Sequence, residues 1–282
     1  MDYDVVIVGG GPSGLSAAIK LAQLFKEKKQ EKSICVLEKS AEIGGHILSG
    51  NVFETTALDE LIPDWKEKNA PLNVPVKKDA IKFLLNDKLS IPVPSFLMPT
   101  MKNHGNYIIS LANLCRWLAE QAESLGVDIF PGFPAAEIIY KEGKVAGVIT
   151  GDMGKDSKGN EKDSFQPGME IFANESTVFA EGCRGNLGKQ LIKKFELDKG
   201  KDPQHYGIGF KEIWEVDNEH HSEGLVMHTN GWPLPDDTPG GSYMYHAENK
   251  QVLLGLVVPL DYKNPHLSLS LIHISEPTRQ SK

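Results

Sequence analysis

The sequence predicts an α/β protein in which a Rossmann-like dinucleotide-binding domain is joined to a second domain of mostly antiparallel strands. Two observations carry this prediction. The segment from Val5 to Leu21 has the pattern of a buried strand, a glycine-rich turn and a helix in direct succession. From Tyr206 onwards, the chain alternates in strand fashion, and its short runs are separated by turns rich in glycine and proline.

The first turn has the spacing of a dinucleotide-binding motif. Gly9, Gly11 and Gly14 follow the apolar run Val5–Val8 as G-x-G-x-x-G. In this motif the first glycine permits a tight turn, the second lets the backbone approach a pyrophosphate, and the third lets the helix pack on the strand. The diphosphate would then lie at the helix N-terminus. The alternative is a glycine-rich turn without a ligand.

The next strand ends in an acid, which favours the dinucleotide interpretation. Residues 33–37 form a second apolar run, and Glu38 follows it at the position where a carboxylate accepts hydrogen bonds from ribose hydroxyls. Gly44 and Gly45 come soon afterwards and suggest another close approach of the backbone to the cofactor. Taken alone, these two glycines are equally compatible with an ordinary loop.

Composition and charge exclude several classes of protein. The 282 residues carry a net charge of -8 from 38 acidic and 30 basic side chains, which argues against nucleic-acid binding. Three cysteines lie far apart, so we expect neither a disulfide framework nor a cysteine-only metal site, and we expect a reducing compartment. No apolar run approaches the ~18 residues of a membrane-spanning helix. Met1 is followed almost directly by the first strand, so no transit peptide is expected.

The middle of the chain is less regular. Residues 52–80 are expected to be helical and then irregular, and a helix with a buried face is expected from Asn106 to Gly126. Three prolines in the apolar stretch Ile91–Met101 forbid a central strand or a long helix there. This stretch could lie in a membrane interface, line an apolar channel or pack on its own core, and composition does not decide between these.

A second glycine fingerprint follows the strand that ends at Ala180. Ala180-Glu181-Gly182 stands before a further glycine and a helical segment from Leu187 to Phe195, as is expected of flavin-binding chains. Cys183 invites a redox role, but we favour a small filler of a tight turn. Arg184 could meet a phosphate or be solvated. No metal-ligand spacing relates the histidines of the second domain, so surface or packing roles are expected for His205, His220, His221, His228 and His246.

With both fingerprints in place, residues 1 to about 267 resemble the N-terminal half of the electron transfer flavoprotein–ubiquinone oxidoreductase family. The wider flavoprotein superfamily would explain only the two fingerprints and Glu38. The narrower resemblance depends on these motifs: LIPDWKE from Leu61, MKNHGNY from Met101, AEGCRGNLGK from Ala180, YGIG from Tyr206, GWPL from Gly231, GGS from Gly240 and GLVVPLDYKNPHLS ending at Ser268.

The resemblance implies an FAD enzyme that takes electrons from reduced electron transfer flavoprotein and passes them to ubiquinone at a membrane surface. Together with the expected absence of a transit peptide, it points to a peripheral location on the cytoplasmic side of a bacterial inner membrane. The full-length family carries a 4Fe–4S cluster, whose cysteine ligands are not in this sequence. Because electrons pass between two cofactor-like rings, no catalytic acid or base is nominated.

The resemblance assigns site residues position by position. Gly240 and Gly241 match the twin glycines that contact the quinone head group, although Pro239 stands before them where an aromatic residue is expected. The stretch Ile91–Met101 falls where the family dips into the bilayer, which favours the membrane interpretation. The residues assigned to FAD are Gly9, Gly11, Pro12, Ser13, Gly14, Glu38, Lys39, Gly44, Gly45, His46, Ala180, Gly182 and Gly185.

The expected organisation is discontinuous. Residues 1–82 and 104–195 would form the FAD-binding domain, and residues 83–103 and 196–268 a mixed, largely antiparallel ubiquinone domain. Residues 269–282 match nothing in the family and are interpreted as a non-native tail. The rival functions are another flavoenzyme of the superfamily, such as a geranylgeranyl reductase-like enzyme or a hydroxylase, and a non-catalytic truncated fragment.

Overall fold

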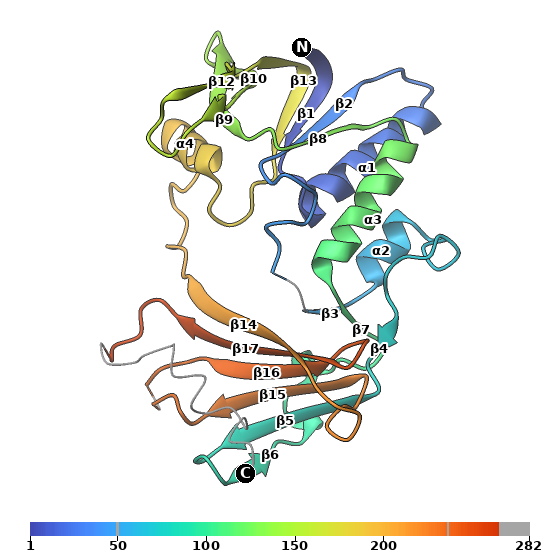
Figure 1. Cartoon of the computed structure of the whole chain (residues 1–282), viewed down its shortest axis with the longest axis vertical. Coiled ribbons are helices and arrows are strands. Elements are labelled where there is room, and N and C mark those ends of the chain that lie inside the picture. Colours follow the sequence, from blue (N-terminus) through green and yellow to red (C-terminus); the bar gives the residue numbers. More distant parts are fainter. Residues whose placement is uncertain (49–50, 236, 265–282) are drawn as a thin grey trace. The chain divides into compact units, whose positions relative to one another are not determined.

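The computed structural model describes residues 1–48, 51–235 and 237–264, and these form two compact units (Figure 1). The first unit contains residues 1–48, 58–71 and 111–202, and the second contains the described parts of 49–57, 72–110 and the chain from 203 onwards. The expected tail at 269–282 lies outside the described residues. No helix in the described ranges is long and apolar enough to span a bilayer.

The first unit is built on a six-stranded sheet. Its strands have the order β8-β2-β1-β13-β10-β9; the first four run parallel, and β10 and β9 are antiparallel to their neighbours. Val6 and Ile7 are fully buried, as the unbroken apolar run of the central strand predicts. The bounds are β1 (Asp2–Val8), β2 (Ile34–Glu38), β8 (Asp128–Pro131), β9 (Ala135–Lys141), β10 (Lys144–Thr150) and β13 (Glu170–Phe179).

Helices α1 (Pro12–Glu27) and α3 (Leu111–Ser124) lie side by side against this sheet (Figure 1). Helix α4 (Asn186–Phe195) packs beside β9. The polar segment between β10 and β13 contains a hairpin of β11 (Met153–Lys155) and β12 (Glu161–Gln166).

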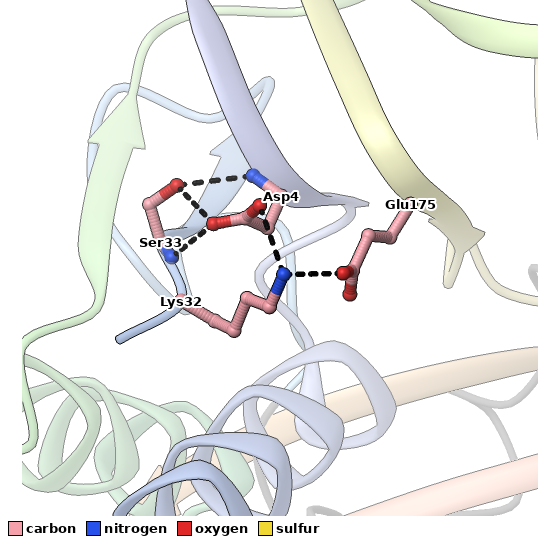
Figure 2. Close-up of polar contacts among 4 residues, drawn as sticks. All are labelled: Asp4, Lys32, Ser33 and Glu175. Carbon is pink, nitrogen blue, oxygen red and sulfur yellow. Dashed lines mark hydrogen bonds and ion pairs between the residues drawn. The ribbon is translucent and has the colours of Figure 1, made fainter. Parts of the chain in front are cut away.

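A polar cluster joins three strands of the first unit at the end opposite the glycine-rich turn (Figure 2). The Asp4 main-chain N–H donates to Ser33 Oγ at 3.0 Å, and the Ser33 N–H donates to the Asp4 carboxylate at 2.8 Å. Lys32 Nζ bridges the Asp4 and Glu175 carboxylates. Hydrogen bonding from Ser33 lowers the pKa of Asp4, which favours the ionised carboxylate. The ionised Asp4 side chain and Lys32 then link the start of β1 to the start of β2 and to β13.

The second unit holds a six-stranded sheet with the order β14-β17-β16-β15-β5-β6. All its neighbours are antiparallel except β5 and β15, which confirms a mostly antiparallel domain. A small sheet, β3-β7-β4, packs on one face through a shared apolar core. The bounds are β3 (Asn51–Phe53), β4 (Val74–Pro75), β5 (Lys78–Leu84), β6 (Ser90–Pro92), β7 (Tyr107–Ile109), β14 (Gly207–Glu215), β15 (Leu225–Gly231), β16 (Gly241–His246) and β17 (Gln251–Pro259).

Two expectations differ from the structure. Residues 107–109 form β7 rather than the start of a helix, because Ile108 completes the core of the small sheet and α3 begins only at Leu111. Residues 52–80 contain β3, α2 (Thr56–Leu61), β4 and the first part of β5. Because β5 pairs along its whole length with β15, residues 72–82 belong to the second unit, whereas the sequence placed them in the first.

The stretch Ile91–Met101 forms neither a central strand nor a long helix. After β6 the chain makes two short 3₁₀ turns, Ser95–Leu97 and Pro99–Met101. The three prolines explain this, because proline cannot supply ladder hydrogen bonds or continue a helix. Phe96 is 73% exposed and Leu97 is 62% exposed, so this stretch does not pack on its own core.

Candidate functional site

Three loops follow the carboxyl ends of neighbouring strands in the first sheet. Val8 at the end of β1 pairs with Leu37 on β2 and with Phe179 on β13. The Gly9 N–H donates to Leu37 O and the Ala180 N–H donates to Val8 O, both at 2.8 Å. Because the three strands are parallel and adjacent, the glycine-rich turn, the loop after Glu38 and the segment 180–185 meet at their carboxyl ends, where ligands of open α/β sheets bind.

The glycines of the first turn have separate structural tasks. Gly9 has φ +112°, and a Cβ there would collide with the Ala180 carbonyl. A Cβ at Gly14 would collide with the Gly9 carbonyl, so this glycine allows helix α1 to approach the turn. At Gly11 a Cβ would meet nothing within 4 Å, so the fold leaves the space above this residue open.

The N-terminus of α1 can receive an anion. Gly11 is its N-cap with extended backbone, no described side chain caps the helix, and Pro12 stands in its first turn. No acidic side chain lies in that turn. The free N–H groups and the helix dipole therefore face open space, which fits a diphosphate. Pro12 and Ser13 are exposed at this end.

Glu38 is held against the same turn. Its Oε2 accepts the Gly10 N–H and its Oε1 accepts the Ser40 N–H, both at 2.8 Å. Each carboxylate oxygen keeps a further lone pair, so the group can still accept ribose hydroxyls. Lys39 beside it is exposed. The carboxylate therefore fixes the turn and remains usable for a ligand.

The second glycine pair is required by the fold itself. Gly44 has φ +83°, and a Cβ there would lie 2.8 Å from the Ala112 carbonyl at the start of α3. A Cβ at Gly45 would collide with Ser40 Oγ, and His46 is exposed. These contacts explain both glycines without a ligand, so their part in binding the cofactor stays a prediction.

The segment after β13 forms an open turn and a helix start. Gly182 has φ +79° with open space around its Cβ position, and Gly185 is the N-cap of α4. The Glu181 carboxylate accepts the N–H groups of Leu187 at 3.3 Å and Gly188 at 2.8 Å. Sequence reasoning did not identify Glu181 in this role, because the usual signal is a polar side chain at the N-cap position, which here is Gly185.

Two of the three cysteines are buried and are poor candidates for redox chemistry. Burial raises the pKa of Cys35 to about 12 and that of Cys115 to about 11, so both stay thiols. Cys183 is exposed. Across the described ranges, no group of three or more His, Cys, Asp or Glu side chains gathers as a metal site.

The second unit contains a cavity of about 550 Å³. Gly240 and Gly241, the expected quinone contacts, line it at the start of β16. Gly240 has φ +153°, and a Cβ there would lie 2.6 Å from the Val257 carbonyl, so the turn needs glycine. Sequence reasoning did not find the side chains that share the lining, among them Met101, His205, His228, Asn230, Tyr243 and Tyr245.

An aromatic group forms one wall of this cavity. The rings of Tyr243 and Tyr245 are stacked with centroids 4.6 Å apart, and His228 Nε2 lies 2.9 Å from Tyr245 Oη. The Tyr243 ring lies across Gly255, where a Cβ would collide with it. Burial raises the pKa of Tyr243 to about 12 and lowers that of His228, so both groups are neutral near pH 7.

Two parts of the chain match known family models. Residues 206–271 match the model described as ETF-QO, ubiquinone-binding, and residues 7–62 match an NAD(P)-binding Rossmann-like domain. The electron transfer flavoprotein-ubiquinone oxidoreductase of Pseudomonas aeruginosa is 59% identical over 271 residues, which cover 95% of this chain and 49% of that protein. The chain thus spans about half the length of the curated relatives it matches.

Solved structures share the fold at low identity. A geranylgeranyl bacteriochlorophyll reductase-like protein from Thermoplasma acidophilum has a TM-score of 0.60 at 18% identity, covering 91% of this chain and 56% of that one. A myxobacterial FAD-dependent halogenase has a TM-score of 0.58 at 14% identity, covering 91% and 53%. This chain is a homologue of the electron transfer flavoprotein–ubiquinone oxidoreductases over their N-terminal part, with a Rossmann-like domain and a region that matches the ubiquinone-binding model of that family.

Proposed function

We propose that this chain is the FAD- and quinone-binding part of an enzyme that transfers electrons from reduced electron transfer flavoprotein to ubiquinone at a membrane surface. The observation that carries the proposal is the position of Gly240 and Gly241. They line the cavity of the second unit, inside the region that matches a ubiquinone-binding domain. The 59% identity to a curated oxidoreductase supports the same donor and acceptor.

The first unit would hold FAD by its main chain and one carboxylate. The N–H groups at the start of α1 would bind the diphosphate above Gly11, and Glu38 would accept the ribose hydroxyls. The turn from Ala180 to Gly185 would border the flavin side. When bound, FAD accepts and releases the electrons.

The second unit would hold the quinone ring. A volume of about 550 Å³ lies within the ~300–1,000 Å³ range of small-molecule pockets. Main-chain groups at Gly240 and Gly241 would meet a quinone oxygen, and the stacked tyrosines would supply apolar ring surface. No general base is needed to pass electrons between two rings, so the residues here would bind and orient the quinone.

An apolar surface of the second unit is proposed to contact lipid. Phe96 and Leu97 are the most exposed of its side chains, and further apolar residues of the β5–β6 hairpin are also exposed: Phe83, Leu85, Leu89 and Ile91. Contiguous exposed apolar side chains mark interaction surfaces, and short apolar loops can enter the headgroup region of a bilayer. Ubiquinone is itself a lipid, so this surface suits its delivery.

Anaerobic mixing with reduced electron transfer flavoprotein tests the proposed donor. The FAD-loaded chain should lose its oxidised flavin absorbance on mixing, and NADPH alone should have no such effect. Reduction by NADPH without electron transfer flavoprotein would contradict the proposal and favour a different flavoenzyme.

A further inference from the structure

The aromatic wall of the cavity contains an arrangement of polar atoms that the proposed quinone contacts do not use. His228 on β15 lies directly opposite Tyr243 on β16, and Tyr245 lies two residues further along the same face. The His228 and Tyr245 rings meet edge to face at 5.5 Å. The three side chains therefore form one contiguous group beside the cavity.

Only part of this group is satisfied by hydrogen bonds. His228 Nε2 pairs with Tyr245 Oη at 2.9 Å. His228 Nδ1 and Tyr243 Oη are buried and have no hydrogen-bond partner within the part of the chain that the structure describes. Buried polar atoms are normally paired, and those left unpaired often belong to functional sites. Here two of them belong to facing residues that line the same cavity.

Burial and the nearby charge of Asp79 have opposite effects on the pKa of His228. Asp79 on β5 is held by Asn103, whose main-chain N–H donates to its carboxylate at 2.8 Å, and its negative charge favours the imidazolium form. Burial favours neutral imidazole and dominates, so the pKa of His228 is lowered. On β16, burial keeps Tyr243 and Tyr245 as neutral phenols.

The remaining neighbours include one lysine. On β14, burial lowers the pKa of Lys211, whose Nζ lies 5.7 Å from the Tyr243 ring centroid. Gly255 on β17 presents no side chain beneath that ring. His205, the other histidine in the lining, is exposed. His228 is therefore a titratable lining residue at which burial and a neighbouring negative charge, Asp79, shift the pKa in opposite directions.

We propose that His228 takes up a proton at Nδ1 when negative charge forms on a quinone in this cavity. This inference depends on the proposed quinone function. A negative charge on the quinone would stabilise a cation on the neighbouring His228, which offsets the penalty of burying the imidazolium. The negative charge of Asp79 also stabilises the imidazolium form of His228. The contact between Nε2 and Tyr245 holds the ring in place while Nδ1 takes up the proton.

The step balances with the proposed reaction. Reduction of a quinone to a quinol consumes two electrons, which the flavin supplies, and two protons, which come from water. One proton resides on His228 Nδ1 until it moves to a quinone oxygen, and the other reaches the second oxygen from solvent. His228 is neutral again when the quinol leaves.

Calorimetry with a charged and an uncharged quinone tests this inference. Lawsone, a hydroxynaphthoquinone, is an anion at neutral pH, whereas menadione is neutral. Titrations of the FAD-loaded chain in two buffers of different ionisation enthalpy give the protons taken up on binding. We expect about one proton per lawsone and none per menadione, since binding and protonation are linked reciprocally.

Variants identify the acceptor. His228→Gln keeps an amide near the position of Nε2 for Tyr245 but cannot titrate, so it should bind lawsone without proton uptake. The matched control His205→Gln should retain the uptake. Nuclear magnetic resonance titration of the unaltered protein gives a second measurement, in which lawsone should raise the pKa of His228.

Three outcomes would overturn the inference. Lawsone binding without proton uptake in the unaltered protein would remove it while leaving the quinone cavity in place. If uptake persisted in His228→Gln but disappeared in His205→Gln, the proton would be taken up by His205, and the assignment to His228 would be wrong. Failure of both lawsone and menadione to bind would remove the quinone cavity and this inference together.

Discussion

Two glycines of the first turn should separate folding from cofactor binding. A Cβ at Gly14 would collide with the Gly9 carbonyl, whereas one at Gly11 would meet nothing within 4 Å. Overpacking of this kind costs about 1–3 kcal/mol, and for Gly14→Ala a gain of up to ~1 kcal/mol in helix propensity offsets part of it. We expect Gly14→Ala to lose about 1–2 kcal/mol of stability, a fall of roughly 2–8 °C in Tm.

Gly11→Val should behave in the opposite way. Its extended backbone suits any residue, and its side chain would occupy open space, so Tm should stay within about 2 °C of the original. That same space is where the diphosphate would approach the helix N-terminus. We expect FAD affinity to fall at least 100-fold, which is about 2.8 kcal/mol.

Thermal unfolding and FAD fluorescence titration measure the two quantities separately. Normal FAD content in Gly11→Val would refute the assigned diphosphate site. Equal destabilisation by Gly11→Val and Gly14→Ala would refute the steric reasoning, because only one of these positions is in contact with the backbone.

Three further perturbations test the second unit. Replacing Phe96 and Leu97 with Asp should weaken cosedimentation with anionic liposomes while leaving Tm unchanged, since both side chains are exposed; unchanged cosedimentation would remove the membrane assignment. Val257→Trp should fill the cavity and weaken menadione binding at least tenfold, whereas Ile213→Trp, at an exposed position outside the lining, should not; equal affinities would place the quinone elsewhere. Burial lowers the pKa of His246, so the unfolded state binds more protons below about pH 6.5 and stability should fall with acidification. His246→Gln should remove part of that acid loss, measured as urea midpoints, and an identical pH dependence in both proteins would contradict the burial argument.

The first sheet was largely predictable because local sequence and tertiary contacts agree there. Val5–Val8 has β-branched residues on both faces, and a buried parallel strand requires such a run. The glycine spacing, the acid at position 38 and the small residues of α1 then follow in a fixed order.

Other elements depend on contacts between distant segments and could not be inferred locally. Residues 107–109 continue into a helical pattern, but Ile108 is buried against β3 and β4 and joins their sheet. The strand 78–84 is defined by parallel pairing with a segment almost 150 residues later, whose register the local pattern does not encode.

The candidate sites divide in the same way. Main-chain features could be predicted where the fold requires glycine, because a Cβ at Gly14, Gly240 or Gly241 would collide with a neighbouring carbonyl. Side chains that are brought together only by strand pairing were not predicted. His228 lies opposite Tyr243 only because β15 and β16 pair in one register, and no spacing in the sequence announces that contact.

The central claim is that the second unit receives a quinone which bound FAD reduces. The most direct measurement is anaerobic reoxidation of the photoreduced, FAD-loaded chain by a short-chain ubiquinone, followed by flavin absorbance. We expect the flavin to be reoxidised with one quinol formed per flavin. The reoxidation rate should fall in Val257→Trp and stay the same in Ile213→Trp. A flavin that stays reduced, or that is reoxidised equally fast in Val257→Trp, would contradict it.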